Sequence, residues 1–235
     1  MIITIDGPVA SGKSTVAQAL AHEFHEFGFY YLYTGLLYRA LAYALVTAYG
    51  YSEEALVAPG EDALEALLQK GRLEYRFDVG AARILFDGKD ITSLLKTEEV
   101  DRISSISSAN AAVRAAVYCL QQQIATGADI IADGRDTGTV VFPNAQIKFF
   151  LTASVEERAF RWRTNQARQG NMVSEDEAIT AVTMRDERDR TRKISPLLPA
   201  EDAILVDNSN WSIEETITYM AAIVRDRYPD FLAKK

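Results

Sequence analysis

Residues 7–14 read Gly-Pro-Val-Ala-Ser-Gly-Lys-Ser and match the phosphate-binding loop pattern G-x-x-x-x-G-K-[ST]. The apolar residues 2–5 precede the loop and a helical stretch from Thr15 follows it, so the motif has the strand, loop and helix that it requires. Backbone N–H groups of such a loop contact phosphate oxygens, and the positive end of the helix dipole points at them. The alternative is a glycine-rich turn before an ordinary helix. The complete motif in this context favours a site for ATP or GTP.

Each polar residue of the loop has an expected role. Lys13 supplies positive charge to the β- and γ-phosphates, and the Ser14 hydroxyl is a candidate ligand of Mg²⁺. The expected triphosphate-binding residues are Gly7, Pro8, Val9, Ala10, Ser11, Gly12, Lys13, Ser14 and Thr15.

A second group of polar residues follows the apolar residues 130–132, where the chain reads Asp133-Gly134-Arg135-Asp136. A strand ending in Asp133 places a carboxylate at the carboxyl edge of a parallel sheet, where open α/β sheets bind ligands. Asp133 is therefore a candidate to hold Mg²⁺ directly or through water. The alternative is a salt-bridged turn, since Asp-Gly is a common turn pair. The position of residues 133–136 after a phosphate loop favours a functional role for them.

Residues 185–192 form a third group and read Arg-Asp-Glu-Arg-Asp-Arg-Thr-Arg. At helical spacing, Arg185, Arg188, Asp189 and Arg192 share one face. A phosphoryl group in transfer needs positive charge around its equatorial oxygens, and an arginine-rich helix can deliver it. The alternative is a solvated helix with internal ion pairs, such as Arg185 with Asp189.

Strand and helix patterns alternate along the chain. The expected core strands are 2–5, 30–33, 129–133, 146–151 and 203–206, and the expected helices are 12–26, 36–48, 53–69, 97–108, 111–126, 155–169, 175–193 and 213–227. Two short alternating strands, 73–77 and 83–86, flank Val79-Gly80 and predict a hairpin that interrupts this rhythm. The pattern predicts an α/β fold with a doubly wound, five-stranded parallel sheet and an inserted lobe that contains the hairpin.

Composition limits the classes of partner and compartment. A chain of 235 residues suits one α/β domain with insertions, and its net charge of −8 argues against nucleic-acid and anionic-membrane surfaces. Cys119 is the single cysteine, which excludes a disulfide framework and a cysteine metal site. No apolar run reaches membrane-spanning length, and the chain begins at its first strand without room for a signal peptide. We expect a cytoplasmic protein without membrane or nucleic-acid partners.

Taken together, these residues resemble the bacterial cytidylate kinases (CMP kinases) of the nucleoside monophosphate kinase superfamily, nearly from end to end. Besides the phosphate loop, the resemblance rests on Ile5-Asp6-Gly7-Pro8, Thr34-Gly35-Leu36-Leu37-Tyr38-Arg39, Val113-Arg114, the run 132–143 and the helix 185–192 with Ser195-Pro196-Leu197. The run 132–143 is the most specific of these motifs. This chain departs from the family at Tyr33, where an Asp is usual, at Asn110, where a Pro is frequent, and at Ser195, where an Ala or Asp is common.

The resemblance implies roles for individual residues. The cytosine base would be contacted by Thr34, Arg114 and Asp136. The ribose would be held by Ser105, Arg185 and Asp189. Phosphate oxygens would be bound by Arg39, Arg135 and Arg192, with Arg161 near the triphosphate. Lys13, Asp133, Arg135 and Arg192 would be the catalytic residues. It further implies a core of residues 1–33, 111–163 and 176–235, a monophosphate-binding region of residues 34–110 and a lid of about residues 164–175.

The implied reaction transfers a phosphoryl group from ATP to CMP or dCMP, with Mg²⁺ and without a covalent intermediate, in a monomeric enzyme. Two alternatives remain open. One is a kinase of the same scaffold that acts on UMP or another small acceptor. The other is a nucleotide-binding regulator that has lost turnover.

Overall fold

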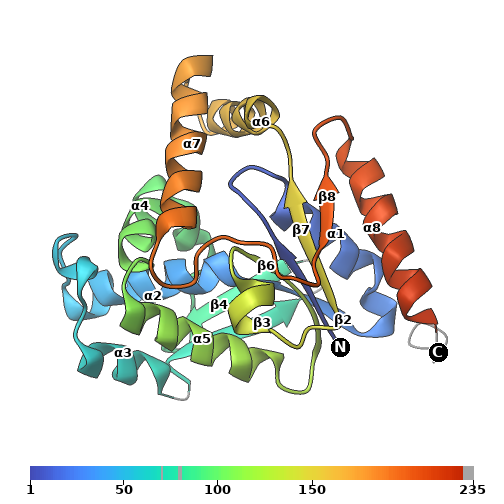
Figure 1. Ribbon diagram of the computed structural model, residues 1–235. Coiled ribbons are helices and arrows are strands. Elements are labelled where there is room, and N and C mark those ends of the chain that lie inside the picture. The colour runs from blue at the N-terminus through green and yellow to red at the C-terminus, as the bar shows by residue number, and fades with distance from the viewer. Residues whose placement is uncertain (70, 79–80, 230–235) are drawn as a thin grey trace. The chain divides into compact units, whose positions relative to one another are not determined.

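A computed structural model of the chain describes residues 1–69, 71–78 and 81–229 (Figure 1). It divides into two compact units, one formed by Met1–Phe29 with Ile131–Lys235 and the other by Tyr30–Ile130.

The larger sheet has five strands in the order β2-β6-β1-β7-β8. Their bounds are β1 Ile2–Asp6, β2 Phe29–Tyr33, β6 Asp129–Gly134, β7 Ile147–Thr152 and β8 Ile204–Asp207. β1 pairs in parallel with β7, with Ile3 opposite Ile147, and β7 pairs in parallel with β8. The predicted fold class and all five predicted strands are confirmed, with bounds that shift by no more than one residue.

The central strands lie in the interior, as expected of a parallel sheet covered on both faces. Ile3, Ile5, Ile130 and Ile131 are fully buried, and the polar Thr4 between the first two is buried as well. This arrangement explains why the strands read as continuous apolar runs rather than as alternating patterns.

The unit that contains the phosphate loop carries four α-helices among its described residues: α1 Lys13–Glu23, α6 Val155–Arg168, α7 Glu175–Thr191 and α8 Ile213–Arg227. Ser174 and Ser212 begin α7 and α8 with capping boxes, and Ser154 caps α6, so polar side chains fix where these helices start. The predicted helix 175–193 is too long, because α7 ends at Thr191 and Arg192 is its extended C-cap. Arg192 is therefore not on the helical face that the sequence predicted. A short π-helix, η4 at Thr137–Val141, was not predicted.

The second unit carries α2 Thr34–Tyr49, α3 Glu61–Leu68, α4 Glu98–Ser107 and α5 Ala111–Ala125, with short 3₁₀ turns η2 Ala55–Val57 and η3 Thr92–Lys96. The predicted helix 53–69 is wrong, because the chain breaks between η2 and α3. Ala58 has φ −144° and ψ 72°, outside the helical region, since the ring of Pro59 disfavours a helical residue before it.

The predicted hairpin is present in the second unit. β3 Leu73–Asp78 pairs antiparallel with β4 Ala81–Phe86, and a third strand, β5 Lys89–Asp90, extends the small sheet. Val79 and Gly80, where the turn was predicted, lie outside the described residues. Across the described parts of the chain, no helix combines the length and the apolar character that crossing a membrane requires.

Candidate active site

The phosphate loop joins β1 to α1 and is held close to the sheet. A Cβ atom on Gly7, whose φ is +154°, would lie 2.0 Å from the Leu151 carbonyl oxygen, so only glycine fits there. Gly12 begins α1 in the left-handed region with φ 94°. The loop therefore has the strand before it, the glycine turns and the helix after it that phosphate binding requires.

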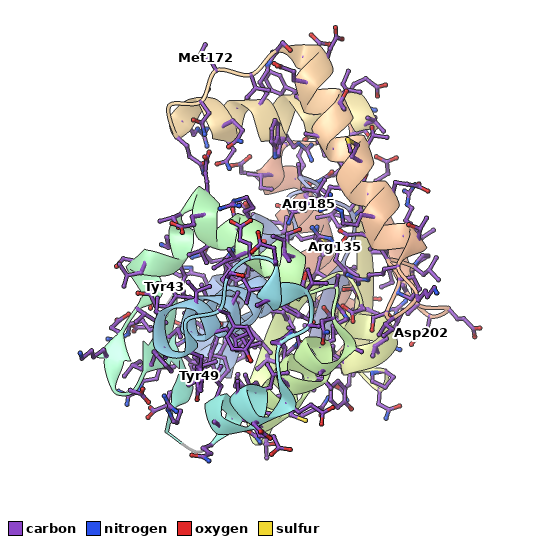
Figure 2. All side chains as sticks on the ribbon, turned by 90° about the vertical axis from the view of Figure 1, so that its left-hand side faces the viewer. Tyr43, Tyr49, Arg135, Met172, Arg185 and Asp202 are labelled. Atoms are coloured by element: carbon purple, nitrogen blue, oxygen red, sulfur yellow. The ribbon has the colours of Figure 1, made fainter. Side chains whose placement is uncertain are left out.

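Lys13 lies in the interior of this loop and is 5% exposed. Its ammonium donates hydrogen bonds to the Pro8 carbonyl and, over 3.3 Å, to Ser11 Oγ. Burial lowers the pKa of Lys13 well below its ordinary value, the Arg135 guanidinium lowers it further, and Arg185 adds to this effect. Figure 2 labels both arginines beside the lower part of α7. This concentration of positive charge is complementary to a polyanion such as a triphosphate.

Ser14 and Asp133 meet at the start of α1 and the end of β6. Ser14 Oγ donates a 2.7 Å hydrogen bond to Asp133 Oδ2, and Asp133 is 4% exposed. Hydroxyl and carboxylate oxygens are ligands that suit Mg²⁺, which usually takes one or two carboxylates and completes its shell with water and phosphate oxygens. The described residues hold no group of three or more His, Cys, Asp or Glu side chains around a possible metal.

A half-buried ion-pair network joins the loop after β6 to the end of α7. Arg135 Nε donates to Asp189 Oδ2 over 2.8 Å, and Arg192 lies 3.7 Å from Asp189 Oδ1 and 3.6 Å from Asp136 Oδ1. Four predicted site residues from separate segments are thus brought together. The Arg135–Asp189 pair reaches across the fold, which contradicts the alternative of a merely solvated helix with internal pairs.

Arg161, on α6, lies next to the phosphate loop as expected. Its guanidinium donates to the Ser11 carbonyl over 3.3 Å and to the Oδ1 and backbone carbonyl oxygens of Asn208 over 3.0 Å each. Asn208, which is 1% exposed, also donates to the Ser11 carbonyl over 3.2 Å. The sequence analysis missed Asn208, although a polar residue directly after a core strand is a recognisable signal.

Asp6 is a second residue that the sequence analysis did not assign to the site. Its two carboxylate oxygens accept hydrogen bonds from the backbone N–H groups of Thr137 and Gly138, over 2.9 Å and 2.7 Å. Burial raises the pKa of Asp6 to about 6, and the nearby Asp136 contributes in the same direction. Asp6 therefore fastens the start of η4, directly after Asp136, to the strand that leads into the phosphate loop. Its signal in the sequence is a carboxylate at the end of a buried strand, as for Asp133.

The predicted residues of the second unit lie on three of its helices. Thr34 begins α2 and is buried, Arg39 on α2 pairs with Asp101, and Ser105 lies on α4. The buried Arg114 on α5 lies with its guanidinium carbon 5.5 Å from the centre of the Tyr38 ring.

Two of the three departures from the family, Tyr33 and Asn110, have structural roles in the same unit. The guanidinium carbon of Arg39 lies 5.7 Å from the centre of the Tyr33 ring. Asn110 is the N-cap of α5, because its Oδ1 accepts from the backbone N–H groups of Ala112 and Val113 over 2.8 Å and 3.2 Å.

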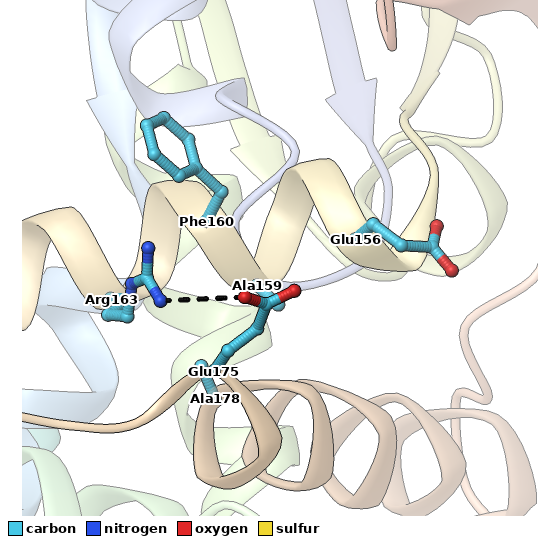
Figure 3. Close-up of a pocket in the computed structure, with 6 residues that line it drawn as sticks. All are labelled: Glu156, Ala159, Phe160, Arg163, Glu175 and Ala178. Carbon is cyan, nitrogen blue, oxygen red and sulfur yellow. Dashed lines mark ion pairs between the residues drawn. The ribbon is translucent and has the colours of Figure 1, made fainter.

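A pocket lies between α6 and α7 and is lined by Glu156, Ala159, Phe160, Arg163, Glu175 and Ala178 (Figure 3). Arg163 and Glu175 form an ion pair of 3.8 Å across it. None of the predicted site residues lines this pocket, although two of its lining residues, Ala159 and Ala178, also pack against Val9 of the phosphate loop.

Comparison with known proteins agrees with these observations. The family model described as "Cytidylate kinase" matches residues 3–226. A cytidylate kinase of Geobacter sulfurreducens is 39% identical over 228 residues, which cover 97% of this chain and 94% of that protein. A cytidylate kinase of Carboxydothermus hydrogenoformans is 41% identical over 224 residues, covering 95% of this chain and 97% of that protein. The solved structure of a shikimate kinase from Bacteroides thetaiotaomicron covers 96% of this chain and 98% of its own, with 10% identity and a TM-score of 0.46. On the strength of the match along its whole length, this chain belongs to the cytidylate kinase family.

Proposed function

We propose that this protein transfers the γ-phosphoryl group of ATP to CMP, and to dCMP, to give ADP and CDP or dCDP. The observation that carries the proposal is a complete phosphate-loop apparatus, with Lys13 buried in the loop and Ser14 bonded to Asp133, in a member of the cytidylate kinase family. Retention of these groups argues against a regulator without turnover.

The phosphate loop, Gly7 to Thr15, would bind the triphosphate of ATP. Lys13 would contact the β- and γ-phosphates, and Arg161 would reach the triphosphate from α6. Ser14 and Asp133 would hold Mg²⁺, Asp133 directly or through water. When bound, the ion would neutralise part of the negative charge of the phosphates.

Phosphoryl transfer itself would need alignment and charge stabilisation rather than a covalent intermediate. Arg135 and Arg192 would join Lys13 in binding the phosphate oxygens. Both guanidinium groups are held by carboxylates, since Asp189 pairs with each of them. Such fixed cations need little reorganisation when charge develops, which is the basis of electrostatic catalysis.

We assign CMP recognition to residues whose chemistry suits the base, the ribose and the monophosphate of CMP. Asp136 would accept a hydrogen bond from the cytosine 4-amino group, Arg114 would donate to the O2 and N3 atoms, and Thr34 would also face the base. Ser105, Arg185 and Asp189 would bind the ribose, and Arg39 would bind the monophosphate. In this proposal residues 34–110 form the monophosphate-binding region and residues 164–175 form a lid.

We further propose that the protein works as a monomer in the cytoplasm. The single cysteine, Cys119, is exposed and free, which suits a reducing compartment. Light scattering of the purified protein and fractionation of the source cells test these two statements separately.

The activity is tested by coupling ADP release to a panel of acceptors: CMP, dCMP, UMP, AMP and GMP. We expect CMP and dCMP to give far higher kcat/KM than the other three nucleotides, and chelation of Mg²⁺ to stop the reaction. Preference for UMP would overturn the substrate assignment. Absence of turnover with every acceptor, in a protein that binds ATP, would overturn the enzymatic assignment.

A further inference from the structure

Arg158 and Asp186 form an ion pair in the interior of the unit that holds the phosphate loop. Their side chains are 3% and 6% exposed, although charged residues of these types are rarely buried. Arg158 comes from α6 and Asp186 from α7. Neither residue belongs to the groups assigned above to ATP, CMP or Mg²⁺.

This pair holds the backbone of Val9, in the middle of the phosphate loop, from both sides. The Val9 N–H donates to Asp186 Oδ1 over 3.1 Å, and the Val9 carbonyl accepts from Arg158 Nη1 over 3.2 Å. The same Arg158 nitrogen bonds to Asp186 Oδ2, and Arg158 Nε donates to the Ala153 carbonyl over 3.0 Å. Two buried charges thus find partners in each other and in the backbone, which is the condition for tolerating them.

Apolar side chains pack around Val9 next to the ion pair. The Val9 side chain packs in a buried cluster with Ala159 of α6 and with Ala178 and Val182 of α7. Trp162 and Ile179 pack against the same cluster. Figure 1 shows α6 crossing the upper part of α7, with the carboxyl end of β7 leading up into α6. The middle of the loop is therefore anchored to the two helices by hydrogen bonds and by packing together.

The contact also bears on the conformation of the loop. Ala10, next to Val9, has φ 58°, a left-handed conformation that a residue with a side chain adopts only where the surroundings hold it. The Val9 N–H points to Asp186, so the shape of the loop at this residue is set by the protein. Because the loop already has its phosphate-binding conformation, ATP binding does not carry the entropic cost of ordering it.

We propose that Arg158 and Asp186 are positioning residues that hold the phosphate loop in its ATP-binding shape and join it to α7. Helix α7 also carries Arg185 and Asp189, so one buried contact sets the positions of the triphosphate loop and of these side chains relative to each other. The proposal deepens, and rests on, the kinase function proposed above. Removal of the pair should weaken ATP binding and slow transfer without removing any group that touches a substrate.

The test is the double variant Arg158→Met/Asp186→Leu. It replaces the ion pair by apolar side chains of similar size, a change that buried pairs often tolerate without loss of stability. We expect a wild-type unfolding midpoint, about a tenfold higher Kd for ADP by calorimetry, and a kcat lower by up to about a hundredfold, the scale that misplacement of about 1 Å produces. The KM for CMP should change much less than the KM for ATP. Hydrogen exchange at residues 8–12 should become faster.

The matched control is Arg163→Met, which leaves Glu175, the last residue of the proposed lid, unchanged. This variant removes another ion pair between α6 and α7, with an N–O distance of 3.8 Å, that does not touch the loop (Figure 3). It should keep the wild-type Kd for ADP and the wild-type kcat. Equal losses in the Arg158/Asp186 double variant and in Arg163→Met would overturn the proposal, because general helix packing would then explain them. Wild-type kinetics and exchange in the Arg158/Asp186 double variant would overturn it as well.

Two further measurements keep the outcome decisive. If the double variant does not fold, Asp186→Asn, which keeps the shape of the side chain, is judged by the same criteria. Binding of ADP and hydrogen exchange do not depend on the acceptor. A protein that turned out not to phosphorylate CMP would therefore fail the proposed function alone, while these two readouts would still decide the role of the pair.

Discussion

The Ser14 hydroxyl donates a 2.7 Å hydrogen bond to the Asp133 carboxylate across a sequence separation of 119 residues. This bond joins the phosphate loop to the end of β6, where the motif that continues through Arg135 and Asp136 begins. Asp6 makes a second connection between the same two regions, since it accepts from the N–H groups of Thr137 and Gly138. The phosphate loop after β1 and the segment after β6 that carries Arg135 and Asp136 are therefore tied to each other at the ends of adjacent strands.

Substitution of Lys13 tests the electrostatic role of the phosphate loop. We expect Lys13→Ala to lower kcat/KM for ATP by at least about a hundredfold, since loss of one such charge contact in the transition state commonly costs about 3 kcal/mol or more. Its unfolding midpoint should not fall, because a buried ammonium is removed together with the cost of its burial. Lys148→Ala removes another buried lysine, which bonds to Asp202 and Pro143, and should lower stability far more than turnover. Near-normal turnover of a folded Lys13→Ala protein would contradict the phosphoryl-transfer mechanism.

Base selection is expected to reside in Asp136. Asp136→Asn keeps the shape of the side chain but adds an amide donor that suits the uracil O4 atom. We expect a large loss of kcat/KM for CMP and a much smaller change, or a gain, for UMP, because a site built for an amino group leaves a buried polar atom unpaired when a carbonyl occupies it. Asp189→Asn is the control. CMP and UMP have the same ribose, so this substitution should lower kcat/KM equally for both substrates. Equal losses in Asp136→Asn would mean that Asp136 does not contact the base.

The turn between α6 and α7 is expected to be the lid. Gly170 has φ 91°, and Met172 beside it is 90% exposed and projects from the tip of the turn (Figure 2). Hydrogen exchange of residues 164–175 should be fast in the free protein and slow when ADP and CMP are both bound. Residues 213–227 of α8 should exchange alike in the two states and serve as the internal control. Equal exchange of residues 164–175 in both states would count against a lid.

Asp6 is expected to make stability depend on pH in the direction opposite to an ordinary carboxylate. Its pKa is about 6 in the folded protein against 3.8 ordinarily, so the folded state binds this proton more tightly than the unfolded chain does. The contribution of Asp6 to the free energy of unfolding must therefore fall as the pH rises from about 4 to about 6, and stay low above that.

The measurement is the difference in the free energy of unfolding between the wild type and Asp6→Asn, in which the contributions of all other carboxylates cancel. The free energy of unfolding of the wild type, minus that of Asp6→Asn, should be smaller at pH of about 7.5 than at pH of about 5. Carbon-detected NMR should place the titration midpoint of the Asp6 carboxyl near 6. A midpoint at the ordinary value, with a difference that does not change with pH, would contradict the expectation.

Asn110 is expected to stabilise the start of α5. Asn110→Ala removes the acceptor of the Ala112 and Val113 N–H groups and should lower the free energy of unfolding by about 1 kcal/mol, the usual cost of losing a helix cap. Asn110→Asp keeps the acceptor and should retain most of that stability, although the bond from Asn110 Nδ2 to the Val57 carbonyl is lost. Chemical denaturation of the three proteins checks the order.

The sequence by itself determined the features that depend on local chemistry. The glycines of the phosphate loop, the apolar runs of the five strands and the hairpin strands follow from the conformations and the burial that neighbouring residues impose. The break in the predicted helix 53–69 is also local, because Pro59 disfavours a helical conformation at Ala58.

Only the tertiary structure decided which polar groups meet. Arg158 and Asp186 look like ordinary residues of solvated helices in the sequence, yet they are buried and bonded to the phosphate loop. The positions of Asp6 and Asn208 at and after core strands do not say that their partners are the η4 backbone and Ser11. The Arg158–Asp186 bond spans 28 residues of the chain and the Asn208–Ser11 bond spans 197. Such contacts form because the packing of helices on the sheet excludes water and leaves each buried polar atom only the partners that the fold brings near. Local sequence patterns do not indicate which partner a buried polar group will have in the folded protein.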